Sequence, residues 1–397
     1  MNKNKLKNIL FINFITMTTF NMAHPVTPTL INTLALPTYM FGVLYSTMAI
    51  AQFVMSPIWG KMSDIKGRKI FLILGVLGYG VSQLGFGLSE MTGTILLFRI
   101  LGGGMSVGFI TVATAYISDV SSEKERVKYL AYYTATGSIA SSIGALLGGS
   151  IGSFGYKYTF IIQFIFSIIV SIVIYYMIDE TIKYKDEKIK LYLDHLKLNK
   201  KSINLKSSVG IMMIVMTLIT ITTTSYNSTI NYYVESVLNM PTTVNGAVMA
   251  VAGIIALIMN VFVNPYLGKK FNENKSIIVS LLIAGSSIIM ASLSKNILIA
   301  LLFLVLFIAS SALVTPMQQS IVSKLAKDNY GEIMGIQGSF KAIGMVTGSL
   351  VSGFIFDYGN KLPFTLGGIC CLFAFSLLLL SNNSLNKSYY NDKEQIN

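Results

Sequence analysis

The residues with the clearest chemistry form a short string of glycines and charged residues, GKMSDIKGRK, at positions 60–69. Gly60 and Gly67 permit a tight turn and close approach of the backbone. Asp64 can accept hydrogen bonds from the exposed amides of a helix N-terminus, and Arg68 can hold a carboxylate through two parallel hydrogen bonds. We expect Asp119 to be its partner. The pattern predicts an ion-pair latch; the alternative is a plain turn whose basic residues only mark one side of a membrane.

Long apolar runs must position this string. The chain has 397 residues, of which 53% are hydrophobic and only 12% are charged, and its mean hydropathy is +0.64. About 20 apolar residues suffice for a helix to cross a bilayer, whereas membrane barrels need segments of ~10 alternating residues. The sequence therefore predicts an all-α membrane protein. Twelve runs qualify: 9–30, 41–59, 70–88, 94–117, 128–153, 157–178, 207–233, 243–266, 276–293, 297–322, 331–355 and 362–381.

The basic residues are distributed unequally between the gaps that separate these runs. Most of the 30 Lys and Arg residues lie in the termini and in every second gap, while the opposite gaps hold only Lys157, Lys295 and Lys361. Basic loops resist translocation, so both termini are predicted to be cytoplasmic, in a multi-pass protein of the cell membrane. The net charge of +13 then reflects topology and attraction to lipid headgroups, and nucleic-acid binding is not expected.

The two halves of the chain resemble each other. A Pro-x-x-Gly-Lys string at 57–61 recurs at 265–269, and a string of small residues at 140–149 recurs at 344–353. Two similar six-helix bundles facing each other would enclose a central cavity suited to alternating access. The expected parts are an N-terminal bundle (1–178), a cytoplasmic linker loop (179–206), a C-terminal bundle (207–381) and a cytoplasmic tail (382–397).

The stretch from Phe41 to Lys69 resembles the signature region of spans 2 and 3 in the major facilitator superfamily. It is most similar to that of the bacterial drug:proton antiporters, which include the tetracycline and multidrug efflux pumps. The one departure is Ile65, where this family usually has Arg. The resemblance implies two pseudo-symmetric six-helix bundles, with Asp64 and Arg68 in a latch that holds the bundles together in one state.

The fifth run carries a row of small residues. Gly144, Gly148 and Gly149 resemble the glycine-rich motif associated with antiporters of this family, although Ala140 and Ala145 depart from it. Small residues four apart form a smooth face that another helix can approach closely. We expect this face to act as a hinge and to meet its counterpart around Gly344, Gly348 and Gly353. The alternative is generic packing of small residues.

Two ionisable residues inside the runs are candidates for coupling transport to protons. Arg99 lies in the fourth run, where Arg99-x-x-x-Gly103 resembles a motif of the same family, and a buried cation is costly in hydrocarbon. It could instead snorkel to the interface. His24 titrates near neutral pH, or it is simply a satisfied polar group. No acid lies in mid-run. Acids at the edges remain as alternatives, namely Asp64, Glu235 and Asp357.

Candidate cavity residues are a cation and several neutral polar groups. Lys341 lies ten residues into the eleventh run, close to mid-membrane, where it needs a wet cavity or a partner. Hydroxyl and amide groups can bind diverse organic molecules, or they can hydrogen-bond one helix to another. The neutral candidates are Tyr226, Asn227, Tyr233 and Gln318.

The interpretation that follows is a transporter, not an enzyme, that exports small organic compounds or drugs by proton antiport. The alternative is transport of anionic or zwitterionic metabolites, because Arg99 and Lys341 are both positive. A remote alternative is an intramembrane serine hydrolase, on the Gly-x-Ser-x-Gly string around Ser106.

The adjacent Cys370 and Cys371 point in different directions on a helix, so no disulfide is expected. No metal or cofactor site is expected either, and the protein is predicted to be monomeric.

Overall fold

The computed structural model describes residues 3–182, 207–325 and 330–390, and every regular element in them is a helix. Each predicted apolar run coincides with a helix or with consecutive helices, which confirms the all-α prediction. Most of the predicted linker loop and the end of the predicted tail, 183–206 and 391–397, lie outside the described residues.

In this part of the chain, 11 helices are long and apolar enough to cross a membrane. The remaining predicted run corresponds to α6, Glu123–Gly152, which is 30 residues long but rich in Gly, Ser and Thr. Its low hydropathy follows from this composition, which suits close packing against other helices through small residues. The chain is therefore a multi-pass membrane protein.

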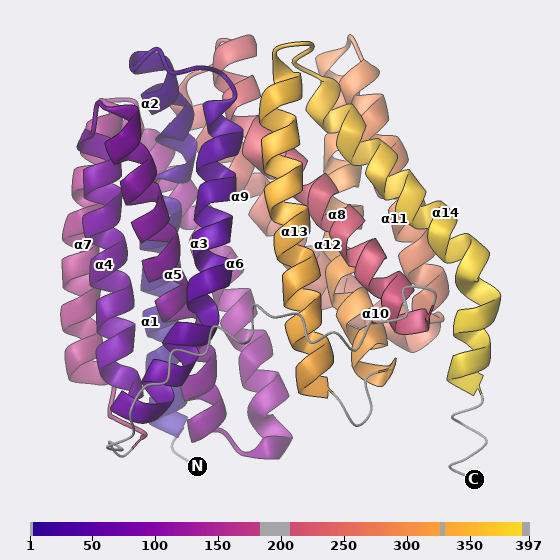
Figure 1. The fold of residues 1–397 in the computed structure, drawn as a ribbon, viewed down its shortest axis with the longest axis horizontal. Coiled ribbons are helices and arrows are strands. Elements are labelled where there is room, and N and C mark those ends of the chain that lie inside the picture. The colour runs from indigo at the N-terminus through magenta and orange to yellow at the C-terminus, as the bar shows by residue number, and fades with distance from the viewer. Residues whose placement is uncertain (1–2, 183–206, 326–329, 391–397) are drawn as a thin grey trace. The chain divides into compact units, whose positions relative to one another are not determined.

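The helices form two compact units (Figure 1). The first unit comprises Met1–Lys197 together with Asn231–Ile254. Its helices are α1 (Lys3–Asn21), η1 (His24–Val26), α2 (Thr27–Thr33), α3 (Met40–Lys66), α4 (Arg68–Leu88), α5 (Thr92–Val120), α6, α7 (Tyr156–Met177), the end of α8, the π-helical turn η3 (Tyr233–Val237) and most of α9.

The second unit comprises Leu198–Ile230 together with Ile255–Asn397. The helices α8 and α9 are thus shared between the units. The helices of the second unit are α8 (Ser208–Tyr232), the end of α9 (Thr242–Ile258), the π-helical turn η4 (Met259–Val263), α10 (Asn264–Lys270), α11 (Glu273–Leu293), α12 (Ile297–Leu325), α13 (Tyr330–Phe356) and α14 (Leu362–Tyr390).

Buried side chains of α1, α3, α4, α5 and α7 form the core of the first unit. The indole Nε1 of Trp59 on α3 donates to the carbonyl oxygen of Gly104 on α5 at 2.7 Å. Gly108 leaves room for that indole, since a Cβ there would lie 2.9 Å from the ring. The Tyr79 hydroxyl on α4 donates to the carbonyl oxygen of Phe20 on α1 at 3.0 Å. These contacts hold the helices in register and so position the side chains at their ends.

Candidate gating site

The turn between α3 and α4 brings Asp64, Gly67 and Arg68 together, whereas Gly60, also predicted to permit the turn, lies within α3. Helix α3 ends at Lys66 and α4 begins at Arg68, with only Gly67 between them. Gly67 has φ of 99°, a conformation that residues with a Cβ rarely adopt. A Cβ at this position would also overlap the carboxylate of Glu180. Glycine is therefore required twice over, for the turn and for the close approach of an acid.

Arg68 lies at the centre of the latch. Its guanidinium donates from Nη2 to Oδ1 of Asp64 at 2.6 Å, and from Nε to Oδ2 of Asp119 at 2.9 Å. A third bond runs from Nη1 to the Ser63 hydroxyl at 2.6 Å. The fork shape of the guanidinium lets one side chain hold three partners at once. Arg68 thereby joins the last turn of α3 to the last turn of α5.

The two acids differ in how much the ion pair with Arg68 can contribute. The side chain of Asp119 is 23% exposed and that of Asp64 is 60% exposed, while Arg68 is only 6% exposed. Exposed ion pairs are worth little because water screens them, whereas removing one partner of a buried pair is costly. The Arg68–Asp119 pair is therefore the stronger structural link. Asp64 is the acid whose carboxylate is more accessible to water.

A third acid completes the cluster. Glu180 follows the end of α7 and accepts hydrogen bonds from the backbone amides of Arg68 and Lys69, at 2.8 and 3.0 Å. A carboxylate at this position satisfies amides that have no partner inside the helix. The acid that accepts from the amides at the start of α4 is therefore Glu180, whereas Asp64 pairs with the side chain of Arg68. The next residue, Thr181, donates from its hydroxyl to Oδ2 of Asp119 at 3.1 Å.

Sequence reasoning missed Glu180 because the acid lies 112 positions from Arg68. The signal available in the sequence was weak: an Asp-Glu-Thr string directly after the sixth apolar run. Its consequence is that the segment leading out of α7 is tied to the start of α4 and, through Thr181, to α5. Four parts of the first unit thus meet around Arg68 and its partner Asp119.

Arg99 is buried inside the first unit. Its Nε donates to the carbonyl oxygen of Leu44 on α3 at 3.0 Å, and its guanidinium lies over the ring of Phe86 on α4, 5.1 Å from the centroid. Only 5% of the residue is exposed, so it does not snorkel along the outside of the unit. The field of Arg99 also acts on His24 in η1 and on Tyr45 in α3. The two coupling candidates therefore lie in the same region of the bundle.

Each of the two glycine faces packs against a helix of its own unit, and their meeting stays a prediction. In α6, a Cβ on Gly144 or Gly148 would overlap the backbone of α1 at Thr18 or Met22. In α13, a Cβ on Gly344 would lie 2.7 Å from the carbonyl oxygen of Thr217 in α8. Each glycine face thus accepts the backbone of the first helix of its own half, since that helix approaches where side chains are missing.

Gly149 is on a different side of α6. A Cβ there would lie 2.8 Å from the carbonyl oxygen of Thr242 and 3.1 Å from Cα of Gly246, both on α9. Likewise, a Cβ on Gly253 would overlap the Ser142 hydroxyl. Helices α6 and α9 therefore pack closely through small residues at two levels along their length.

The predicted cavity residues differ in their surroundings. Gln318 is buried and donates to the carbonyl oxygen of Met212 at 2.7 Å, so it links α12 to α8. Tyr226 is buried against Phe307 and Phe364, with ring centroids 5.1 and 6.4 Å away. Asn227 and Lys341 are exposed on α8 and α13, and Tyr233 is half-buried in η3. The side-chain amide of Gln318 therefore hydrogen-bonds one helix to another, which was the alternative to a role in the cavity.

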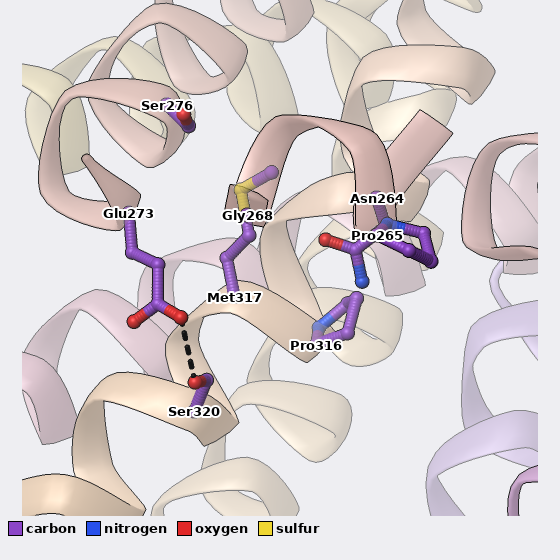
Figure 2. Close-up of a pocket in the computed structure, with 8 residues that line it drawn as sticks. All are labelled: Asn264, Pro265, Gly268, Glu273, Ser276, Pro316, Met317 and Ser320. Atoms are coloured by element: carbon purple, nitrogen blue, oxygen red, sulfur yellow. Dashed lines mark hydrogen bonds between the residues drawn. The ribbon is translucent and has the colours of Figure 1, made fainter. Parts of the chain in front are cut away.

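The second unit contains a pocket of about 290 Å³ at the repeat of the latch string (Figure 2). Glu273, at the start of α11, accepts a hydrogen bond from the Ser320 hydroxyl at 3.0 Å. Ser276 stands 208 positions after Arg68, the same offset that relates the two Pro-x-x-Gly-Lys strings. The buried arginine cluster is therefore particular to the first half. The pocket is lined by Asn264, Pro265, Gly268, Glu273, Ser276, Pro316, Met317 and Ser320.

Ser106 has no catalytic surroundings. It is buried in α5, where its hydroxyl donates to the carbonyl oxygen of Gly103 at 3.0 Å and lies 3.1 Å from the amide nitrogen of Gln52. Neither contact provides a base that could remove its proton. Within the ranges that the structure describes, no group of three His, Cys, Asp or Glu side chains could hold a metal ion.

The chain belongs to the Major Facilitator Superfamily, whose sequence pattern it matches over residues 9–327 and 212–395. It is similar to two proteins of Bacillus subtilis (strain 168), in both cases over nearly the whole length. It is 24% identical to Multidrug resistance protein 2 over 377 residues, 94% of each chain. It is 26% identical to Multidrug resistance protein 1 over 383 residues, 95% of this chain and 96% of that one.

A solved structure gives the same fold. The bacterial homologue of the human lysosomal transporter Spinster, in an inward-facing and occupied conformation, superimposes with a TM-score of 0.77. The match covers 95% of this chain and 96% of that chain at 15% sequence identity. The predicted major facilitator fold is confirmed, and the chain is a transporter.

Proposed function

We propose that this transporter exports small organic compounds, including drugs, from the cytoplasm across the cell membrane by alternating access. The relatives named as multidrug resistance proteins match it over at least 94% of its length. Because they are matched from end to end, both halves of the chain contribute to the likeness. The protein acts as a monomer in the lipid bilayer, with its bundles joined by the linker loop 179–206.

The observation that carries this proposal is the Arg68 cluster. Arg68, Asp64, Asp119 and Glu180 tie together four segments at one end of the first unit. Ion pairs and hydrogen bonds of this kind are either formed or broken, which gives the two distinct states that a gate requires. A cluster of apolar side chains would hold the same helices together without responding to charge.

The Arg68 cluster lies on the cytoplasmic side in this proposal. Lys61 and Lys66 near the end of α3 and Lys69 at the start of α4 lie at the same end of these helices, and basic residues near membrane spans favour the cytoplasmic face. Met40 and Leu88, at the other ends of α3 and α4, then lie toward the outside. The helix α3 has 27 residues, so at ~1.5 Å per residue it spans roughly 40 Å, enough to separate the two faces.

Export is coupled to proton entry in this proposal, with Arg99 and His24 as coupling residues. The buried Arg99 has only a carbonyl oxygen and an aromatic ring as described partners. A buried cation with no acid beside it raises the local potential, so it can repel a proton or a cationic substrate. His24, which the charge of Arg99 reaches, is the second proposed coupling residue.

A transport assay tests the proposal. Purified protein in vesicles is given a panel of cationic, neutral and anionic compounds under an imposed pH gradient. Accumulation of compounds against their gradient, abolished when the pH gradient is collapsed, is expected. Transport that proceeds at the same rate without a pH gradient would contradict antiport.

A second candidate function is the transport of anionic or zwitterionic metabolites. Lys341 supports it, because this cation is exposed on α13 in mid-helix, about one turn from the Gly344 contact with α8. A cation in a low-dielectric site attracts anions strongly. Preferential transport of the anionic members of the panel would favour this function over drug export.

A further inference from the structure

Glu235 is an acid that the transport mechanism above does not use. It lies in η3, a π-helical turn at the end of α8. Turns of this type often occur at functional sites, because the extra residue redirects the side chains around it. η3 packs beside α2, which leads to the start of α3. Glu235 is therefore at the end of the first unit away from Asp64.

The carboxylate of Glu235 joins three segments of the first unit. Its Oε2 accepts a hydrogen bond from the Thr29 hydroxyl of α2 at 3.0 Å, and a second from Nδ2 of Asn245 in α9 at 3.3 Å. Asn245 Nδ2 also donates to the carbonyl oxygen of Pro25 at 3.2 Å. Beside it, Nδ2 of Asn32 in α2 donates to the Ser236 hydroxyl at 3.0 Å.

The surroundings of Glu235 are neutral. The helices α2 and α9 contain no charged residue, and Glu235 is the only one in η3. None of the ion pairs of the described residues involves it. The titratable groups on the elements packed around it are His24 in η1, Tyr39 and Tyr45 at the start of α3, and Tyr232 and Tyr233 in the segment itself.

We propose that Glu235 binds a proton from the outside and that this binding closes the outer end of the transporter. In this hydrogen-bonded arrangement the carboxyl group of Glu235 is half-buried, and its hydrogen-bond donors, Thr29 and Asn245, are neutral. Partial removal from water penalises the charged form, and no cation offsets that penalty. A protonated carboxyl keeps Oε2 as the acceptor for Thr29 and Asn245 and gains a donor on Oε1. Loss of the proton to water restores the charge and favours opening.

This inference rests on the proposed function, in which an exporter that has released its substrate outside must close that end again. Proton uptake at Glu235 would drive the closing step. The step moves one proton from water to the carboxylate oxygen and requires no other reactant. Glu235 is thus a positioning residue of the outer gate, and its effect should be visible without any substrate.

The test measures the distance between the two segments directly. Spin labels are placed at Thr33 on α2 and at Leu238 after η3, both exposed, after replacement of Cys370 and Cys371 by Ser. In the wild type, the ratio of closed to open molecules should rise by up to about tenfold when the pH is lowered from about 8 to about 5. This change is expected if binding of one proton is coupled to closing. Glu235→Gln, which resembles the protonated form, should be closed at every pH.

Glu90→Gln is the matched control. Glu90 lies at the same end of the first unit, 71% exposed, and pairs with Lys157 at 3.3 Å outside this network. It should keep the response of the wild type, and Glu235→Asp should keep a response as well. A wild type whose label distance does not change with pH, or a Glu235→Gln variant that responds like the wild type, would overturn the proposal. Vesicle transport is recorded in parallel, so a failure of proton-driven export is detected separately.

Discussion

Arg68 Nε on α4 donates to Oδ2 of Asp119 on α5 at 2.9 Å, and only 6% of the arginine side chain is exposed. The pair therefore exists largely out of water, between the start of one helix and the end of the next. Asp119 also accepts from the Thr181 hydroxyl. Loss of the arginine would leave this acid without its counter-charge in a half-buried site.

The first prediction concerns this pair. Arg68→Ala should lower the free energy of unfolding by about 2–3 kcal/mol, because it leaves a partly buried carboxylate unpaired. Thermal unfolding of the purified protein in detergent measures the change. The control is Lys157→Ala, which removes an exposed pair with Glu90 and should cost at most about 1 kcal/mol. Equal losses in the two variants would show that burial of the Arg68 pair does not matter.

The second prediction concerns the cap on α4. Glu180→Gln keeps the shape of the side chain but removes its charge, so the amides of Arg68 and Lys69 lose a charged acceptor. The start of α4 should be destabilised by about 0.5–1 kcal/mol. Hydrogen exchange at these amides should become faster. Asp179→Asn, at the neighbouring acid that pairs with Lys5, should leave their exchange unchanged.

The third prediction concerns the glycine face of α6. Gly148→Ala places a methyl group against the backbone of Met22 and should force α1 and α6 apart, at a cost of about 1–3 kcal/mol. Gly338→Ala in α13 is the control, because nothing lies within 4 Å of its Cβ, and it should be neutral or slightly stabilising. Thermal unfolding compares the two. An unchanged stability of Gly148→Ala would refute close packing at this site.

The fourth prediction separates the two candidate substrates. If Lys341 faces the transport path, Lys341→Gln should reduce transport of anionic compounds or permit transport of excluded cations, since the positive potential is lost. Transport rates of a matched anion and cation in vesicles give the ratio. Should the wild type export cations well and the variant behave identically, Lys341 has no role in selecting the substrate.

The fifth prediction concerns orientation. A cysteine introduced at Ser122, beside the Arg68 end of α5, should react only with reagents that reach the cytoplasm. One at Met91, which begins the same helix at the other end and is 73% exposed, should react from outside. Reaction of the Ser122 label from outside intact cells would invert the proposed topology.

Much of the latch could be predicted from the sequence. The string at 60–69 contains its own turn, and Asp64 and Arg68 are four positions apart, so their proximity is a local property of the chain. Asp119 could be paired with Arg68 because charge at the end of an apolar run must lie at a membrane face. Glu180 could not be found this way, since several acids follow α7 and only packing decides which one reaches the amides of α4.

The amino-acid sequence by itself determined where the apolar helices lie and the family, because a bilayer admits only long apolar helices whose backbone bonds are satisfied internally. The tertiary structure decided which helices the glycine faces accept and that Glu235 joins α2 to α9. Hydropathy is a property of each segment alone. Close packing and hydrogen bonding depend on which backbone segments approach each other, and this is determined only when all the helices pack together.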